Sequence, residues 1–180
     1  MTTGTTPLDQ DADDAKRPTT LLLVYTWDIL LAIGALIEVF APFAGGVEVA
    51  GKTVDTPLVV QILVALSNAA FAGALILIGT LLTRHDTWVR RAQIVVLSMA
   101  GGIRAVTFVI DSATGHTLDV GGMLGILVIL LIDVLAIYAL TSARVVAWFR
   151  DPGPVPAYIG ALIAFWAAVS VAFFALRSLS

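Results

Sequence analysis

The sequence predicts an all-α integral membrane protein with five transmembrane helices, arranged as two similar helical hairpins followed by a fifth helix. Apolar residues make up 59% of the 180-residue chain and charged residues only 13%, whereas soluble domains contain about 45–50% and about 25%. The apolar residues also fall into five runs that are separated by short polar segments. Each run has the roughly 20 residues that a helix needs to cross the hydrocarbon core of a bilayer.

Residues 1–19 form a polar tail that is rich in Thr and Asp. The tail has no apolar periodicity, so we expect it to be disordered. It does not resemble a signal peptide, because the apolar run that follows is too long and lacks a small-residue cleavage site. The membrane domain is predicted to begin at residue 20 and to continue to residue 180.

The first hairpin is predicted from spans at about 20–43 and 57–82. Pro42 should end or kink the first span, because proline cannot donate the helical hydrogen bond. Between the spans, valines at 47, 49 and 54 flank Ala-Gly-Lys, which favours a short β-hairpin. Thr56 and Pro57 then form a helix start signal.

The remaining spans are predicted at about 87–111, 120–143 and 156–176. Trp88, Arg90 and Arg91 lie where the third span should meet the membrane interface, which suits aromatic and basic anchors. The run Asp-Pro-Gly-Pro-Val-Pro at 151–156 should form a turn, since no helix can continue through three alternating prolines.

Basic residues predict the orientation in the membrane. One side of the five-span topology carries Lys16, Arg17, Arg84, Arg90, Arg91, Arg144 and Arg150, and the other carries Lys52 and Arg177. Cytoplasmic loops are enriched in Lys and Arg. We therefore expect a multi-pass protein of the bacterial plasma membrane, with a cytoplasmic N-terminus and a C-terminus outside.

The two loops on the outer side share one pattern. Gly-Lys-Thr-Val-Asp at 51–55 matches Gly-His-Thr-Leu-Asp at 115–119, and at the same offset Ile-Leu-Val at 62–64 matches Ile-Leu-Val at 126–128. Both hairpins would enter from the cytoplasm, so the sequence favours a parallel repeat with its pseudo-twofold axis along the membrane normal. Chance matching of apolar runs is the alternative.

Five polar side chains inside the predicted spans are candidate functional residues: Asp28, Glu38, Asn68, Arg104 and Asp133. At ~1.5 Å per residue, Glu38 and Arg104 both lie roughly 10 Å below the outer ends of their spans. An arginine at this depth needs a partner, hydration or a function. We predict an ion pair between Glu38 and Arg104, whereas no basic residue closely matches the depth of Asp133. Asp28 is within reach of Arg84 or Arg144 if its side chain extends to the interface.

Small residues recur on two helices in patterns that favour close helix packing. These residues are Gly121 and Gly125 on the fourth span, and Gly160, Ala164 and Ala168 on the fifth. Spacings of four residues place them on one helix face, where a neighbouring backbone can approach closely. A homo-oligomer or a larger membrane complex is thus an expected arrangement.

Enzyme and cofactor motifs are absent from the sequence. There are no cysteines, and the two histidines, His85 and His116, fall on opposite sides of the membrane. We predict no catalytic, metal or cofactor site, and the formal charge of −3 gives no case for nucleic-acid binding. The favoured function is a non-enzymatic accessory or scaffold subunit. The alternative is a small oligomeric transporter or channel for an ion, proton or small solute that uses Glu38, Arg104 and Asp133.

Overall fold

The computed structural model describes residues 18–45, 47–49, 52–54, 57–113 and 120–179. Within these ranges the helices are α2 (Thr19–Gly45), α3 (Leu58–Leu81), α4 (Thr87–Ala113), α5 (Val120–Thr141), α6 (Ala143–Trp148) and α7 (Ala157–Leu179), and the strands are β1 (Val47–Val49) and β2 (Lys52–Val54). Five of the helices, all except α6, are long and apolar enough to cross a membrane. The chain is therefore a helical, multi-pass membrane protein. Residues 1–17 of the predicted tail lie outside the described residues.

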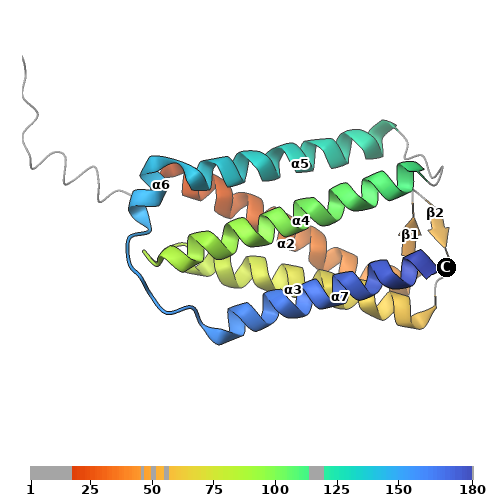
Figure 1. Cartoon of the computed structure of the whole chain (residues 1–180). Coiled ribbons are helices and arrows are strands. Elements are labelled where there is room, and N and C mark those ends of the chain that lie inside the picture. Colours follow the sequence, from red (N-terminus) through yellow and green to blue (C-terminus); the bar gives the residue numbers. More distant parts are fainter. Residues whose placement is uncertain (1–17, 46, 50–51, 55–56, 114–119, 180) are drawn as a thin grey trace, which may run out of the picture.

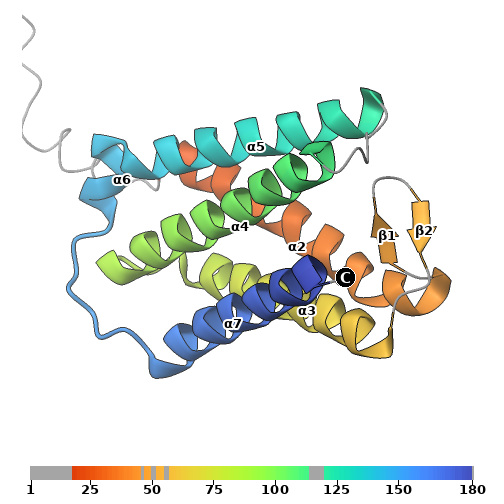
Figure 2. The same cartoon turned by 45° about the vertical axis from the view of Figure 1, so that its right-hand side comes forward.

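The long helices form a closed ring of four, with α7 outside it. Helix α2 packs against α3 and α5, α4 packs against the same two helices, and α7 packs against α3. Figure 1 shows the long helices running roughly side by side, and Figure 2 shows the α2–α3 and α4–α5 hairpins diverging toward the end that carries β1 and β2. We call this end the hairpin end. The predicted duplication of the two hairpins stays a prediction.

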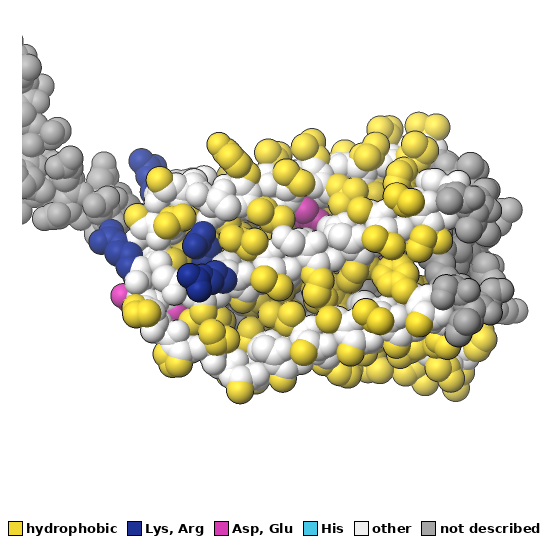
Figure 3. Space-filling view, in the orientation of Figure 1, with side chains coloured by type: hydrophobic (Ala, Val, Ile, Leu, Met, Phe, Trp, Pro, Cys, Tyr) yellow, Lys and Arg dark blue, Asp and Glu magenta, His cyan; other side chains and the backbone are white. Residues whose placement is uncertain are grey.

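The lipid-facing surface is apolar and the arginines gather at one end. Large side chains such as Leu23, Phe40 and Tyr138 are more than half exposed along the helices, as expected for surfaces that face acyl chains rather than water. Arg84, Arg90, Arg91, Arg144 and Arg150 lie at the opposite end from the β-hairpin, which we call the arginine end, and basic side chains cluster there in Figure 3.

The predicted spans and the β-hairpin are confirmed, with helix ends that differ by up to three residues from the prediction. In the hairpin Val47 pairs with Val54 and Val49 pairs with Lys52. Helix α6 was not predicted, since Ala143–Trp148 follows α5 almost directly and reads as its end. No helix crosses the proline-rich segment 151–156, as the sequence indicates.

Pro42 does not end α2, and the backbone carbonyl that it cannot bond has another hydrogen-bond donor. The helix continues to Gly45, and Pro42 lacks the N–H that would bond the carbonyl of Glu38, four residues earlier. The side-chain amide of Asn68 on α3 donates to this same carbonyl at 3.4 Å. Prolines are tolerated in membrane helices where a neighbouring group satisfies the freed carbonyl. Asn68 therefore has a structural role in joining α3 to α2.

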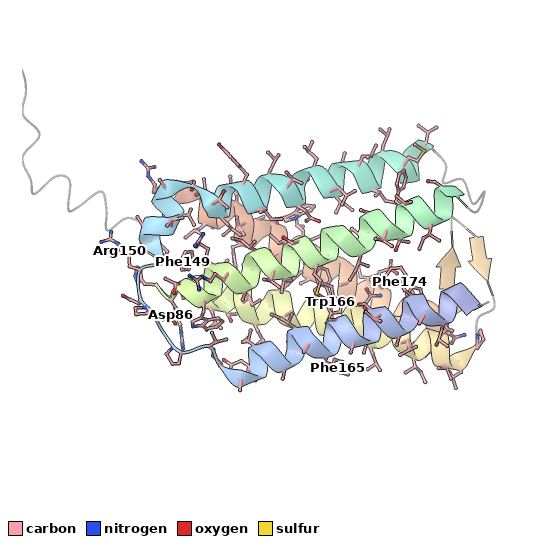
Figure 4. All side chains as sticks on the ribbon, viewed as in Figure 1. Asp86, Phe149, Arg150, Phe165, Trp166 and Phe174 are labelled. Carbon is pink, nitrogen blue, oxygen red and sulfur yellow. The ribbon has the colours of Figure 1, made fainter. Side chains whose placement is uncertain are left out.

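The segment that leads from α6 to α7 is fixed to the turn between α3 and α4. The Thr87 N–H donates to the Asp151 carbonyl at 2.9 Å, and the Asp151 N–H donates to the His85 carbonyl at 3.0 Å. The His85 ring lies 4.3 Å from the Trp148 ring, centroid to centroid. Asp86 lies so close to Gly153 that a Cβ there would be 2.7 Å from the Asp86 Cγ, so a larger residue would require the Asp86 side chain to shift. Figure 4 labels Asp86, Phe149 and Arg150 at this end.

Candidate functional site

A buried ion pair joins α4 to α5 within the ring of helices. Arg104 Nη1 donates to Asp133 Oδ2 at 2.6 Å. The indole N–H of Trp27 on α2 donates to the other carboxylate oxygen, Asp133 Oδ1, at 2.8 Å. Asp133 is only 2% exposed, whereas Arg104 is 24% exposed. Three helices are thus connected through one carboxylate, which accepts two hydrogen bonds and has a compensating charge.

A second polar contact lies nearer the arginine end. Gln93 Nε2 on α4 donates to Asp28 Oδ1 on α2 at 2.6 Å. Asp28 is 1% exposed and Gln93 is 0% exposed. Within the described part of the chain, Asp28 Oδ2 and Gln93 Oε1 have no hydrogen-bond partner. Two acceptor atoms are therefore buried without donors, which costs free energy at each of them.

These contacts follow one face of α4. Gln93 and Arg104 are eleven residues apart, which places them only about 20° apart around a helix at ~100° per residue. Leu97 and Ala100, which lie between them on the same side, are buried in the core. Helix α4 therefore presents a polar and a charged side chain to α2 and α5 at two different depths.

A cavity of about 570 Å³ lies beside the ion pair, near the middle of the long helices. Its lining comes from α2, α3, α4, α5 and α7, and includes the polar side chains of Glu38, Ser67, Asn68 and Arg104 and the aromatic side chains of Trp27, Phe71 and Trp166. Its volume and its mainly apolar walls are those of sites that bind small organic molecules. The α2 residues Leu30, Gly34 and Glu38, four residues apart, are exposed at this cavity.

Aromatic contacts connect the ion pair to α7. The Phe71 and Trp166 rings stack with centroids 4.9 Å apart, and the Arg104 guanidinium carbon lies 5.6 Å from the Phe71 ring centroid. Trp166 comes from the middle of α7 in Figure 4. Ser67 on α3 and Ser170 on α7 add a hydrogen bond at 3.2 Å. Helix α7, although outside the ring, thus supplies one wall of the cavity.

The predicted pairing of Glu38 with Arg104 is wrong, because Arg104 pairs with Asp133 instead. Glu38 and Arg104 do line the same cavity. The prediction that no basic residue matches Asp133 fails for the same reason. Asp28 does not extend to Arg84 or Arg144 at the interface, since its carboxylate is buried against Gln93.

Sequence reasoning missed Gln93, Trp27, Phe71 and Trp166. Gln93 had a usable signal, because it is an amide inside an apolar span on the same helical face as Arg104. The three aromatic residues had none, since a Trp or Phe in a membrane span usually packs against lipid or a neighbouring helix. The expectation that the chain is not an enzyme stays a prediction.

The small residues predicted to pack are exposed within this chain. Gly121, Gly125, Gly160, Ala164 and Ala168 are all exposed, and no other atom lies within 4 Å of a Cβ built on Gly125 or Gly160. Helix α7 packs on α3 through a different face, which includes Ile159 and Trp166. Comparisons of this chain with protein families, curated proteins and solved structures found no match.

Proposed function

We propose that the protein is a non-enzymatic carrier that binds a small organic solute in its intramembrane cavity. The observation that supports the proposal is the cavity of about 570 Å³, whose lining combines Glu38, Asn68 and Arg104 with aromatic rings. Apolar walls with a few convergent polar groups are typical of ligand sites between the helices of a bundle. Polar and charged residues within a membrane span are costly and are commonly associated with substrate pathways.

Access to the cavity from the lipid is suggested by a second, neighbouring cavity. It measures about 330 Å³ and lies between α2 and α5, with walls that include Thr20, Leu23 and Ala139. Trp27 and Leu30 line both cavities, and the Leu30 side chain is 56% exposed. A lipophilic solute in the bilayer would therefore reach the polar groups by passing between these two helices.

The binding proposal predicts that filling the cavity abolishes solute binding. Gly34 lines the cavity and has no atom within 4 Å of a built Cβ, so the added side chain of Gly34→Leu should occupy part of the cavity. Gly102→Leu is the matched control, since Gly102 is also open but does not line the cavity. We expect energy transfer from tryptophan to N-phenyl-1-naphthylamine, a neutral fluorescent probe, to be saturable in nanodiscs. The affinity should fall about tenfold or more in Gly34→Leu and should be unchanged in Gly102→Leu. Equal binding by both variants would contradict the proposal.

The orientation proposal places the arginine end in the cytoplasm of a bacterial cell and the hairpin end at the outer surface. The cluster of arginines at one end of the bundle supports it. Thr83 at the arginine end and Ser112 at the hairpin end are both exposed. In intact cells an impermeant thiol reagent should label the Ser112→Cys variant and not the Thr83→Cys variant. The Thr83→Cys variant should be labelled only after the cells are lysed. The reverse pattern would overturn the orientation.

A second candidate function, an accessory or scaffold subunit, is favoured by the exposed small residues on α7. Gly160, Ala164 and Ala168 face away from the rest of this chain, and such a face lets a helix from another copy approach closely. We therefore expect a homodimer through α7. Ala164→Leu should convert it to a monomer in light scattering after size-exclusion chromatography. Phe165→Leu, at an exposed position about 100° around the same helix from Ala164, should leave the dimer intact. A monomeric wild-type protein, or equal behaviour of the two variants, would count against assembly through this face.

A further inference from the structure

The charged groups around the cavity leave one carboxylate without a compensating charge. Arg104 donates to Asp133 at 2.6 Å, so the charges of these two residues offset each other. Glu38 lines the same cavity from α2 and is exposed there. Within the described part of the chain, no cationic side chain lies within ion-pair distance of the Glu38 carboxylate. Asp133 does not itself line the cavity, but counted together Arg104, Asp133 and Glu38 give the surroundings of the cavity a net charge of −1.

The aromatic side chains that line the cavity also favour a positively charged ligand. Trp27 and Trp166 both line the cavity, from α2 and α7, and one face of Trp166 is stacked on Phe71. The faces of aromatic rings attract cations, and tryptophan does so most strongly. One face of Phe71 already has a cation over it, because the Arg104 guanidinium carbon lies 5.6 Å from its centroid. A bulky organic cation in the cavity would therefore have both aromatic side chains and the Glu38 carboxylate among its lining residues.

From this arrangement we infer that the cavity selects a lipophilic organic cation, in which a bulky apolar body surrounds or carries a single positive charge. The apolar walls and the adjoining cavity between α2 and α5 accommodate the apolar body. Glu38 supplies the counter-charge, because electrostatic attraction is stronger in a low-dielectric site than in water. Inorganic cations do not fit as well, since most of the lining residues are apolar and offer them no oxygen ligands.

This inference rests on the proposed function. Two ions of the same shape and opposite charge test the preference for cations separately from solute binding itself. Tetraphenylphosphonium and tetraphenylborate are nearly equal in size and opposite in charge. Each would be titrated as a competitor of N-phenyl-1-naphthylamine in nanodiscs, with wild-type protein, Glu38→Gln, Glu38→Lys and Asp151→Asn. Asp151 is an exposed acid at the arginine end, so its change controls for net charge. Because the ions partition differently into lipid, the comparison is made between variants for each ion.

We expect Glu38→Gln to weaken competition by tetraphenylphosphonium about tenfold and to strengthen competition by tetraphenylborate. Glu38→Lys should reverse the preference, and Asp151→Asn should behave like the wild type. If both ions compete and neither Glu38→Gln nor Glu38→Lys changes their competition, the inference is overturned but the proposal of solute binding still holds. Competition by tetraphenylborate that is weakened by Arg104→Gln and unchanged by Glu38→Gln would assign the cavity to anions. If the neutral probe itself does not bind, the proposed function fails together with the inference.

Discussion

Replacing Asp133 with asparagine should reduce the stability of the protein by about 2–4 kcal/mol, because the change leaves the Arg104 guanidinium inside the membrane without a counter-charge. Asparagine keeps the size of the side chain and an oxygen for the Trp27 indole N–H, which now bonds Asp133 at 2.8 Å. The loss of stability therefore measures the missing negative charge rather than a change in packing. Thermal unfolding in a mild detergent, followed by tryptophan fluorescence, would measure it.

Arg104→Gln should cost less than Asp133→Asn. Arginine cannot lose its proton in a protein, whereas a carboxyl group left without its partner is able to bind one. Asp133 would also keep its hydrogen bond from Trp27. The double variant should be more stable than the sum of the single losses implies, by roughly 1–3 kcal/mol of coupling.

Glu38→Gln is the matched control for this pair, since Glu38 lines the same cavity but does not bond Arg104. It should leave the unfolding temperature nearly unchanged. Additive losses in the Asp133 and Arg104 double variant, or a coupling of Arg104 to Glu38 instead, would show that the ion pair does not stabilise the fold.

The membrane spans were predictable, because hydrocarbon allows only long apolar helices to cross it. The partner of Arg104 was not, because depth along a helix was estimated from Cα positions alone. Side chains lean toward the N-terminus of their helix. Helices α4 and α5 are antiparallel, so Arg104 leans toward the arginine end and Asp133 leans toward the hairpin end, and the two converge. Glu38 lies on α2, which runs in the same direction as α4. The side chains of Glu38 and Arg104 therefore lean the same way and are not brought closer together.

The cavity was also beyond prediction, for a different physical reason. Its walls depend on the rotation of each helix about its own axis, and apolar spans with little amphipathic pattern do not fix that rotation. Trp166 and Phe71 are 95 positions apart and stack only because α7 lies on α3. The β-hairpin before α3 depends on local turn residues, and it was predicted correctly.

The second large effect is expected at the buried contact between Asp28 and Gln93. Gln93→Leu removes the N–H that bonds Asp28 Oδ1 at 2.6 Å. The Asp28 carboxylate, 1% exposed and with Oδ2 already lacking a partner among the described residues, would then have no donor. We expect a loss of about 1–3 kcal/mol, the cost of a buried polar group left unsatisfied.

Two further variants distinguish this explanation from a simple packing defect. Asp28→Leu combined with Gln93→Leu removes every unpaired polar atom at the contact, so it should recover most of the loss or exceed the wild type, as seen when buried polar pairs are replaced by apolar side chains. Asp28→Asn keeps the shape and adds an N–H that is able to satisfy Gln93 Oε1, which has no partner among the described residues. It should therefore raise the unfolding temperature. If Asp28→Asn and the double leucine variant are both less stable than Gln93→Leu, the Asp28 carboxylate must be required by the fold in a way that its contact with Gln93 does not explain.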